Sequence, residues 1–214
     1  MIETAILEAA KAFDTATLYE ANGKRGALPH VIKPIDRTFR TVGWAFTVEG
    51  PPGDNLWLHR AIAVAAPRDV LVVSVRGGYN HGYWGEVMST AARERGLAGV
   101  VINACVRDAS LLRDIGFPVF ARGLCIRGTT KDAAGSGFLN GPLAMGDVVI
   151  EPGDLVVGDG DGVVAVARHR VPAALTEAKG RQESEARIIE RLKGGETTLQ
   201  IYNWPPAPGR ANST

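Results

Sequence analysis

The sequence predicts one α/β domain that begins with helices and ends with a long charged helix. Strand-like and helical segments alternate between residues 41 and 121, as they do in βαβ units. Short valine-rich segments, punctuated by Gly, Pro and Asp, follow between residues 124 and 166 and are typical of a tight antiparallel or barrel-like sheet. No linker separates these two parts, so a single domain over residues 1–204 is the simplest interpretation, and we expect 205–214 to be a disordered tail.

Composition and charge place the chain among ordinary soluble proteins. Its 214 residues are 45% hydrophobic and 22% charged, with a formal net charge of +1, which gives no general attraction to nucleic acid or to anionic membranes. No apolar run reaches membrane-spanning length, and the N-terminus lacks a signal-peptide pattern. We therefore expect a cytoplasmic protein, in which Cys105 and Cys125 are reduced core thiols rather than a disulfide or a metal pair.

The N-terminal region predicts helices followed by a loop and a strand. Residues 2–22 place apolar side chains at helical intervals, and Thr15 is a candidate cap for a second short helix that ends before Gly23. A polar, proline-containing loop covers 26–36, and the alternation at 41–48 predicts a strand.

The middle of the chain predicts two βαβ units. Residues 56–65 have helical spacing, and 70–75 form a β-branched strand that runs into a glycine-rich loop at 76–85. A helix is expected over 86–97, and the apolar run at 99–106 predicts a buried strand.

The remaining elements are shorter, apart from the last. A helical turn at 109–115 and a strand at 118–121 precede the valine-rich strands. Asp-Gly-Asp at 159–161 is either a β-turn, which we favour, or a cation site. Pro172 fits the first turn of a helix that reaches Leu192 and is ended by glycines.

Glu86, Arg107 and Asp108 are the candidate catalytic residues. Arg107 and Asp108 follow the predicted strand at 99–106, so they are expected at its carboxyl end. A guanidinium there can hold a carboxylate or a developing enolate oxygen, and Asp108 can ligate Mg²⁺ or Mn²⁺. Glu86 can accept hydrogen bonds from waters around the metal. The alternative is an ordinary salt bridge at a strand end.

Gly85, Glu86, Val87 and Met88 form a candidate binding site for an anion. Unpaired amides at the start of a helix attract a carboxylate, and a glycine-rich loop after a strand places such a start at the edge of a sheet. The alternative is that the glycines only shape the loop. Neither GxGxxG nor GxxxxGK[ST] is present, which disfavours nucleotide binding.

Other polar and aromatic residues are weaker candidates. His81, Tyr83 and Trp84 either line the pocket or form an exposed loop, and Thr129–Lys131 are either its polar rim or a solvated loop. No zinc-like Cys/His spacing and no GxSxG motif occur. The three isolated histidines are expected to be structural; they are His30, His59 and His169.

The stretch from Gly85 to Gly123 resembles the RraA-like family, and within it the class II 4-hydroxy-4-methyl-2-oxoglutarate / 4-carboxy-4-hydroxy-2-oxoadipate aldolases. Its motif is an acidic residue, twenty residues, then Arg-Asp. Further landmarks lie at 51–55, 128–131 and 159–166, and the resemblance extends over about residues 15–204. It implies a swivelling β/β/α fold, assembled as homotrimers or homohexamers with active sites between subunits.

The resemblance also implies an activity connected with aromatic-compound degradation. A divalent metal on Asp108 would assist retro-aldol cleavage of a 4-hydroxy-2-oxo di- or tricarboxylic acid to pyruvate, with oxaloacetate decarboxylation as a side activity. Arg107 would stabilise the enolate, and the Gly85–Met88 amides would bind the pyruvoyl carboxylate. A glutamate from a neighbouring subunit is also implied, for which Glu183 is the first candidate.

Two alternatives remain within the same resemblance. One is an oxaloacetate decarboxylase or another 2-oxo acid lyase, and the other is a non-catalytic regulator of ribonuclease E. Regulators commonly lack the aspartate after the arginine, so Asp108 favours the enzyme. Glu86 stands where the best-known aldolases have aspartate, which changes the reach of the carboxylate that positions the catalytic water.

Overall fold

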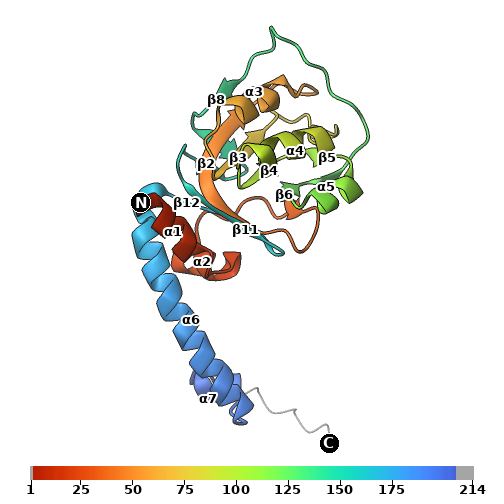
Figure 1. Ribbon diagram of the computed structural model, residues 1–214. Helices are drawn as coiled ribbons and strands as arrows, with labels where there is room; N and C mark the ends of the chain where they lie inside the picture. The colour runs from red at the N-terminus through yellow and green to blue at the C-terminus, as the bar shows by residue number, and fades with distance from the viewer. Residues whose placement is uncertain (1, 206–214) are drawn as a thin grey trace, which may run out of the picture.

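The computed structural model describes residues 2–205 and shows a mixed α/β protein built on one eight-stranded sheet (Figure 1). The strands follow the order β1-β6-β4-β3-β2-β11-β12, and β8 pairs with the carboxyl end of β2. The predicted α/β class is therefore confirmed. The tail expected at 205–214 lies outside the described residues, apart from Pro205.

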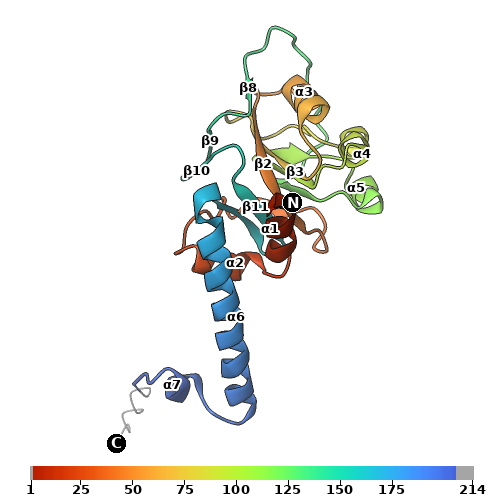
Figure 2. The ribbon, with the colours of Figure 1, turned by 60° about the vertical axis from the view of Figure 1, so that its left-hand side comes forward.

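Four parallel strands form the centre of this sheet and alternate with three helices. The strands are β2 (Thr41–Glu49), β3 (Asp69–Ser74), β4 (Gly99–Ile102) and β6 (Val119–Ala121). The helices are α3 (Leu56–Val64), α4 (Glu86–Glu94) and α5 (Ala109–Ile115). All three helices lie on one side of these strands, and the β9–β10 hairpin lies on the other (Figure 2). The βαβ prediction is confirmed, although α4 ends earlier than expected because Gly96 adopts a left-handed conformation.

Antiparallel strands extend the sheet at both ends. They are β1 (Lys33–Pro34), β8 (Phe138–Leu139), β11 (Leu155–Asp159) and β12 (Gly162–Val166), and a separate hairpin pairs β9 (Leu143–Met145) with β10 (Val148–Ile150). The Lys33 ammonium donates to the Asp161 carbonyl oxygen, so β1 and β12 approach each other and the sheet nearly closes. The segments at 124–166, which were expected to form one tight sheet, are instead divided: β8, β11 and β12 join the main sheet, while β9 and β10 form a separate hairpin. Asp-Gly-Asp is the turn of the β11–β12 hairpin.

The predicted strand at 99–106 is wrong in one respect, because it breaks into two pieces. After β4 the chain leaves the main sheet, and β5 (Cys105–Val106) pairs with β7 (Gly123–Leu124) in a separate two-stranded sheet. The amide of Cys105 donates to the Tyr79 carbonyl oxygen at 2.9 Å, so the glycine-rich loop replaces β3 as its neighbour. Arg107 and Asp108 consequently follow β5 and lie beside that loop.

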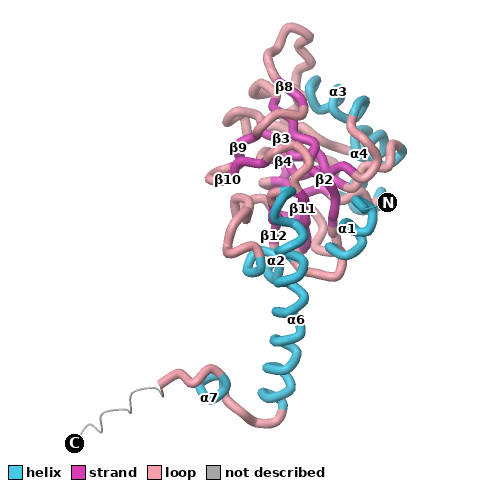
Figure 3. The backbone as a smooth tube through the Cα atoms, turned by 90° about the vertical axis from the view of Figure 1, so that its left-hand side faces the viewer, coloured by secondary structure: helices cyan, strands magenta, loops and turns pink. Residues whose placement is uncertain are grey.

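Helices α1 (Ile2–Ala10), α2 (Thr15–Ala21) and α6 (Val171–Lys193) pack around a second, smaller core against β11 and β12. Only the first part of α6 is buried, through Val171, Ala174 and Ala178. The rest of α6 projects from the body and leads to α7 (Thr198–Ile201) (Figures 1 and 3). The predicted long C-terminal helix is therefore present.

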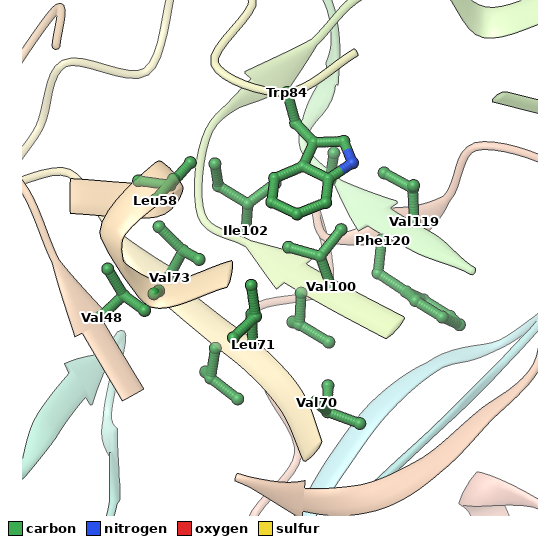
Figure 4. Close-up of a cluster of buried hydrophobic side chains, with 14 of the residues drawn as sticks. Val48, Leu58, Val70, Leu71, Val73, Trp84, Val100, Ile102, Val119 and Phe120 are labelled. Carbon is green, nitrogen blue, oxygen red and sulfur yellow. The ribbon is translucent and has the colours of Figure 1, made fainter. Parts of the chain in front are cut away.

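The larger core lies between the parallel strands and their helices (Figure 4). Trp84 belongs to this core although it precedes α4, and its indole stacks on Phe117 at a centroid distance of 6.1 Å. Its Nε1–H donates to the Ser89 hydroxyl at 2.6 Å. The end of the glycine-rich loop is thus fixed by burial of a large aromatic side chain, which also fixes where α4 begins.

The cap of α2 differs from the expected one and provides a stability test. Asp14, rather than Thr15, accepts the Thr17 amide at 2.7 Å, while Thr15 instead donates to Asp159. Asp14→Ala is expected to lower the free energy of unfolding by about 1 kcal/mol, because one helix-terminal amide loses its acceptor. Urea denaturation would measure the change. Asp161→Ala serves as a control, and equal midpoints for the two variants would contradict the assignment of the cap.

Candidate active site

A hollow of about 270 Å³ lies at the start of α4. One wall consists of the loop and helix residues at 82–88 together with Arg107 and Asp108. A second wall comes from the beginning of α3 and from the segment 128–131. The structure therefore brings together Gly85, Glu86, Val87, Met88, Arg107 and Asp108, as the sequence predicted. A larger hollow of about 550 Å³, beside α2 and the β9–β10 hairpin, contains none of these residues.

The aromatic residues before α4 line this hollow and are fully buried, so the exposed-loop alternative is wrong for Tyr83 and Trp84. The Tyr83 hydroxyl accepts the Gly53 amide at 2.6 Å and donates to the Gly78 carbonyl oxygen at 2.5 Å. Burial raises the pKa of this phenol, so it stays protonated as a structural bridge. His81 stands edge-on to Tyr83 and does not line the hollow.

The first turn of α4 presents free amides to the hollow. Ser89 is the first residue whose amide bonds back along the helix, to the Gly85 carbonyl oxygen at 3.0 Å. The Glu86 amide donates to Asp108 Oδ2 at 3.1 Å. Within residues 2–205, the amides of Val87 and Met88 have no acceptor, as expected for the start of a helix. In the first turn of α4, the Glu86 amide is thus used by Asp108, and the Val87 and Met88 amides remain for a ligand.

Arg107 and Asp108 are held close to the glycine-rich loop by backbone contacts. The Arg107 amide donates to the Trp84 carbonyl oxygen at 2.9 Å, and Asp108 begins α5 with a left-handed backbone, φ 64°. A methyl group added at Gly85 would overlap the Asp108 carboxylate, and one at Gly82 would overlap the Cys125 carbonyl oxygen and press on Arg107. Glycine at both positions therefore lets the loop lie against the pair.

The salt-bridge alternative for this pair describes only part of the geometry. Arg107 Nε lies 3.7 Å from Asp108 Oδ2, and their side chains are 50% and 33% exposed. An ion pair at that distance and exposure contributes little to stability. Both side chains remain accessible from the hollow, and Arg107 keeps its remaining N–H donors for another partner.

The residues present suit a hard divalent cation that retains most of its waters. Asp108 offers a carboxylate oxygen that faces the hollow, and Glu86, on the exposed first turn of α4, offers a second carboxylate. No group of three or more metal-ligating side chains occurs within residues 2–205. A protein-only cage is thus absent from the described chain, whereas Mg²⁺ commonly uses one or two carboxylates plus water and substrate oxygens.

Asn55 and His59 line the second wall, and the sequence did not predict either as a site residue. They lie one turn apart at the start of α3, where the His59 amide bonds to the Asn55 carbonyl oxygen at 3.3 Å. Burial lowers the pKa of His59, and the charge of Lys131 lowers it further, against an opposing effect from Asp54. Their i, i+4 spacing could have indicated that the two side chains lie on one face of a helix. An asparagine and a histidine at that spacing do not form a recognisable motif, however.

The remaining predicted residues lie elsewhere or have structural roles. Glu183 is exposed on the projecting part of α6 and does not line the hollow of its own chain. Cys105 and Cys125 are free, as expected, but both are half-buried rather than in the core, and burial raises the pKa of Cys105. No helix within 2–205 combines the length and apolar character needed to cross a membrane.

The fold and the hollow define an α/β protein with a small, polar binding site at the start of a helix. Residues 9–165 match the RraA-like family, described as Aldolase/RraA. Because the match covers well over half of the sequence, the chain belongs to the RraA-like family. This confirms the resemblance and the fold that it implied.

Individual relatives agree with this membership. A protein of Halalkalibacterium halodurans, provisionally named a 4-hydroxy-4-methyl-2-oxoglutarate aldolase, is 37% identical over 161 residues, which is 75% of this chain and 76% of that protein. An uncharacterised Pseudomonas syringae protein has a crystal structure that matches with a TM-score of 0.82 at 30% identity, covering 92% of both chains. A Streptomyces coelicolor protein, described as an unusual member of the RNase ES inhibitor RraA family, matches with a TM-score of 0.76 at 26% identity, covering 87% and 98%.

Proposed function

We propose that this protein is a divalent-metal-dependent lyase that cleaves a 4-hydroxy-2-oxo di- or tricarboxylic acid by a retro-aldol reaction and releases pyruvate. The substrate would be 4-hydroxy-4-methyl-2-oxoglutarate or 4-carboxy-4-hydroxy-2-oxoadipate. The observation that carries the proposal is that the Arg107 guanidinium, the Asp108 carboxylate and two free helix amides face one hollow. The name of the Halalkalibacterium relative supports the same reaction class.

The residues of this chain divide the reaction between binding and charge stabilisation. The Val87 and Met88 amides bind the carboxylate of the 2-oxo acid, where the positive end of the helix dipole favours an anion. As the C3–C4 bond breaks, its electron pair moves toward the C2 oxygen, and the Arg107 guanidinium stabilises the charge that develops there. Mg²⁺ or Mn²⁺ held by Asp108 would supply Lewis acidity for the same oxygen.

Glu86 takes part in the proton transfer. The C4 hydroxyl must lose its proton as C4 becomes a carbonyl group, and a water oriented by the Glu86 carboxylate relays that proton. Protonation of C3 then completes pyruvate. Oxaloacetate decarboxylation would pass through the same enolate, so it is the expected side activity, and an enzyme devoted mainly to that reaction is the nearest alternative.

The family resemblance further suggests that the protein works as a trimer or hexamer. Glu183 would then reach the active site of a neighbouring subunit. The projection of α6 away from its own body supports this arrangement, because the second half of that helix is largely exposed within residues 2–205 (Figure 3).

A regulator of ribonuclease E is the second candidate function. The match to the Streptomyces protein supports it, since that protein is described as a member of an RNase ES inhibitor family. Capture of ribonuclease E by the purified protein, together with no pyruvate release from any 2-oxo acid, would favour the regulator over the lyase.

Metal removal gives a direct test of the lyase. Pyruvate release from a panel of 4-hydroxy-2-oxo acids and oxaloacetate, followed through lactate dehydrogenase, is expected to be lost in EDTA and restored by excess Mg²⁺ or Mn²⁺. The same panel ranks aldol cleavage against decarboxylation. Pyruvate release that continues at full rate after EDTA treatment and desalting would contradict the role of the metal.

A further inference from the structure

The second wall of the hollow, formed by α3 and the segment 128–131, has a polar character that pyruvate binding alone does not require. It carries Asn55 and His59 from α3, and Lys131 from the segment that follows β7. Lys131 is the cation of this wall, and the carboxylates that line the hollow, Glu86 and Asp108, belong to the other wall. The nearby Asp54 carboxylate is buried and does not line the hollow.

This wall is held together by a buried aspartate. Asp54 is 2% exposed, and its carboxylate accepts the Leu56 amide at 2.8 Å, the Thr130 hydroxyl at 3.0 Å and the Asp132 amide at 2.5 Å. Backbone bonds between Asn55 and Thr130, at 3.2 Å, and between Thr130 and Gly53, at 2.8 Å, strengthen the connection. These bonds fix the segment that contains Lys131 against the start of α3. Lys131 and His59 therefore line the same part of the hollow.

Asn55 provides independent support for a ligand at this wall. Its side chain is buried, with 6% of the residue exposed, and its Nδ2 donates to the Tyr83 carbonyl oxygen at 3.0 Å. The same Nδ2 lies 3.5 Å from Met88 Sδ, which is also an acceptor. Because both neighbours on this side of the amide are acceptors, the amide nitrogen rather than the oxygen must face them. Asn55 Oδ1 then has no partner within the described chain. A buried acceptor without a donor is costly, so this oxygen is suited to a hydrogen-bond donor that arrives with the ligand.

We propose that Lys131 and His59 bind the second carboxylate of the substrate, the one attached to C4, and so select dicarboxylic over monocarboxylic 2-oxo acids. This inference rests on the proposed function, which places the first carboxylate at the amides of α4 on the first wall. The Lys131 ammonium supplies the charge, and the half-buried imidazole of His59 supplies an N–H donor. Asn55 Oδ1 accepts from a hydroxyl or water beside C4.

Two non-cleavable ligands test the subsite without catalysis. 2-Oxoglutarate and 2-oxopentanoate share the chain length and the 2-oxo acid group, and they differ only in a terminal carboxylate or methyl group. Titration calorimetry on the full chain, with excess Mg²⁺, is expected to show about tenfold or tighter binding of 2-oxoglutarate, the effect of one charge-assisted hydrogen bond. Lys131→Met should remove most of this preference, and His59→Phe should reduce it by about threefold.

Arg127→Met is the matched control, because Arg127 is an exposed cation on the same segment that does not line the hollow. It should keep the wild-type preference, which separates a local contact from the general field of nearby positive charges. Equal affinities of the wild type for the two ligands, binding of neither ligand, or a full preference in Lys131→Met would overturn the subsite. A Lys131-dependent preference in a protein that releases no pyruvate from any 2-oxo acid would support the subsite and reject the lyase.

Discussion

Replacing Asp108 with asparagine is expected to lower metal-dependent pyruvate release by about a thousandfold, because a loss of several kcal/mol of charge stabilisation has that effect on a rate. Asparagine is a sharper choice than alanine. The backbone at Asp108 is left-handed, a conformation that asparagine adopts more readily than most residues. Its carbonyl oxygen can also still accept the Glu86 amide, so the start of α4 should be preserved.

The matched control for this prediction is Asp114→Asn. Asp114 is exposed on α5, the helix that Asp108 begins, and it lies outside the hollow. Circular dichroism and thermal unfolding should show both variants folded, and Mn²⁺ affinity, measured by the relaxation of water protons, should fall only for Asp108→Asn. An Asp108→Asn protein with near wild-type activity would refute the assignment of the metal to this residue.

Arg107→Lys is expected to reduce kcat by about 100-fold or more, the usual effect of losing one donor that stabilises a developing oxyanion. A lysine keeps the charge but cannot reproduce the planar fork of a guanidinium. The expected loss appears in kcat more than in KM, because Arg107 acts most strongly on the charge that develops as C3–C4 breaks. Steady-state kinetics on the best substrate of the panel would measure both constants.

Arg127→Lys is the control, because it also replaces an arginine with a lysine but lies on the surface outside the hollow. Its kcat and KM should stay within about twofold of the wild-type values, as is usual for surface substitutions. Proton exchange at the methyl group of pyruvate is a further measurement, because it requires enolate formation without C–C cleavage. The enolate role of Arg107 would be wrong if Arg107→Lys lost aldol cleavage but exchanged these protons at the wild-type rate.

Local patterns in the sequence predicted most of the elements. Alternation at 41–48, the β-branched run at 70–75 and the helical spacing after Asn55 depend on neighbours close in the chain, and the structure confirms them. The break between β4 and β5 was not predictable in this way. It arises because Cys105 pairs with Tyr79 across a loop, a contact that no periodicity in 99–106 encodes.

The sequence predicted the first wall of the candidate site, and on the second wall it offered only Thr129–Lys131, as a polar rim or a solvated loop. The Glu86, Arg107 and Asp108 spacing identified residues that the structure brings into one hollow, although their catalytic roles stay predictions. The other wall depends on Asp54 joining α3 to a segment more than seventy residues later in the chain, through its hydrogen bond to Thr130. His59 was expected to be structural because it is isolated in the sequence, and its proximity to Lys131 follows only from that connection.

The two walls of the hollow have separate origins in the chain, and this has an evolutionary consequence. Residues that would form and hold the enolate come from 82–88 and 107–108, whereas those that would contact the rest of the substrate come from 55–59 and 128–131. Descendants of such a protein can therefore diverge in the second set while the first stays constant. New substrates would then be acquired by mutation of these two short segments, with the carbon–carbon bond chemistry inherited unchanged.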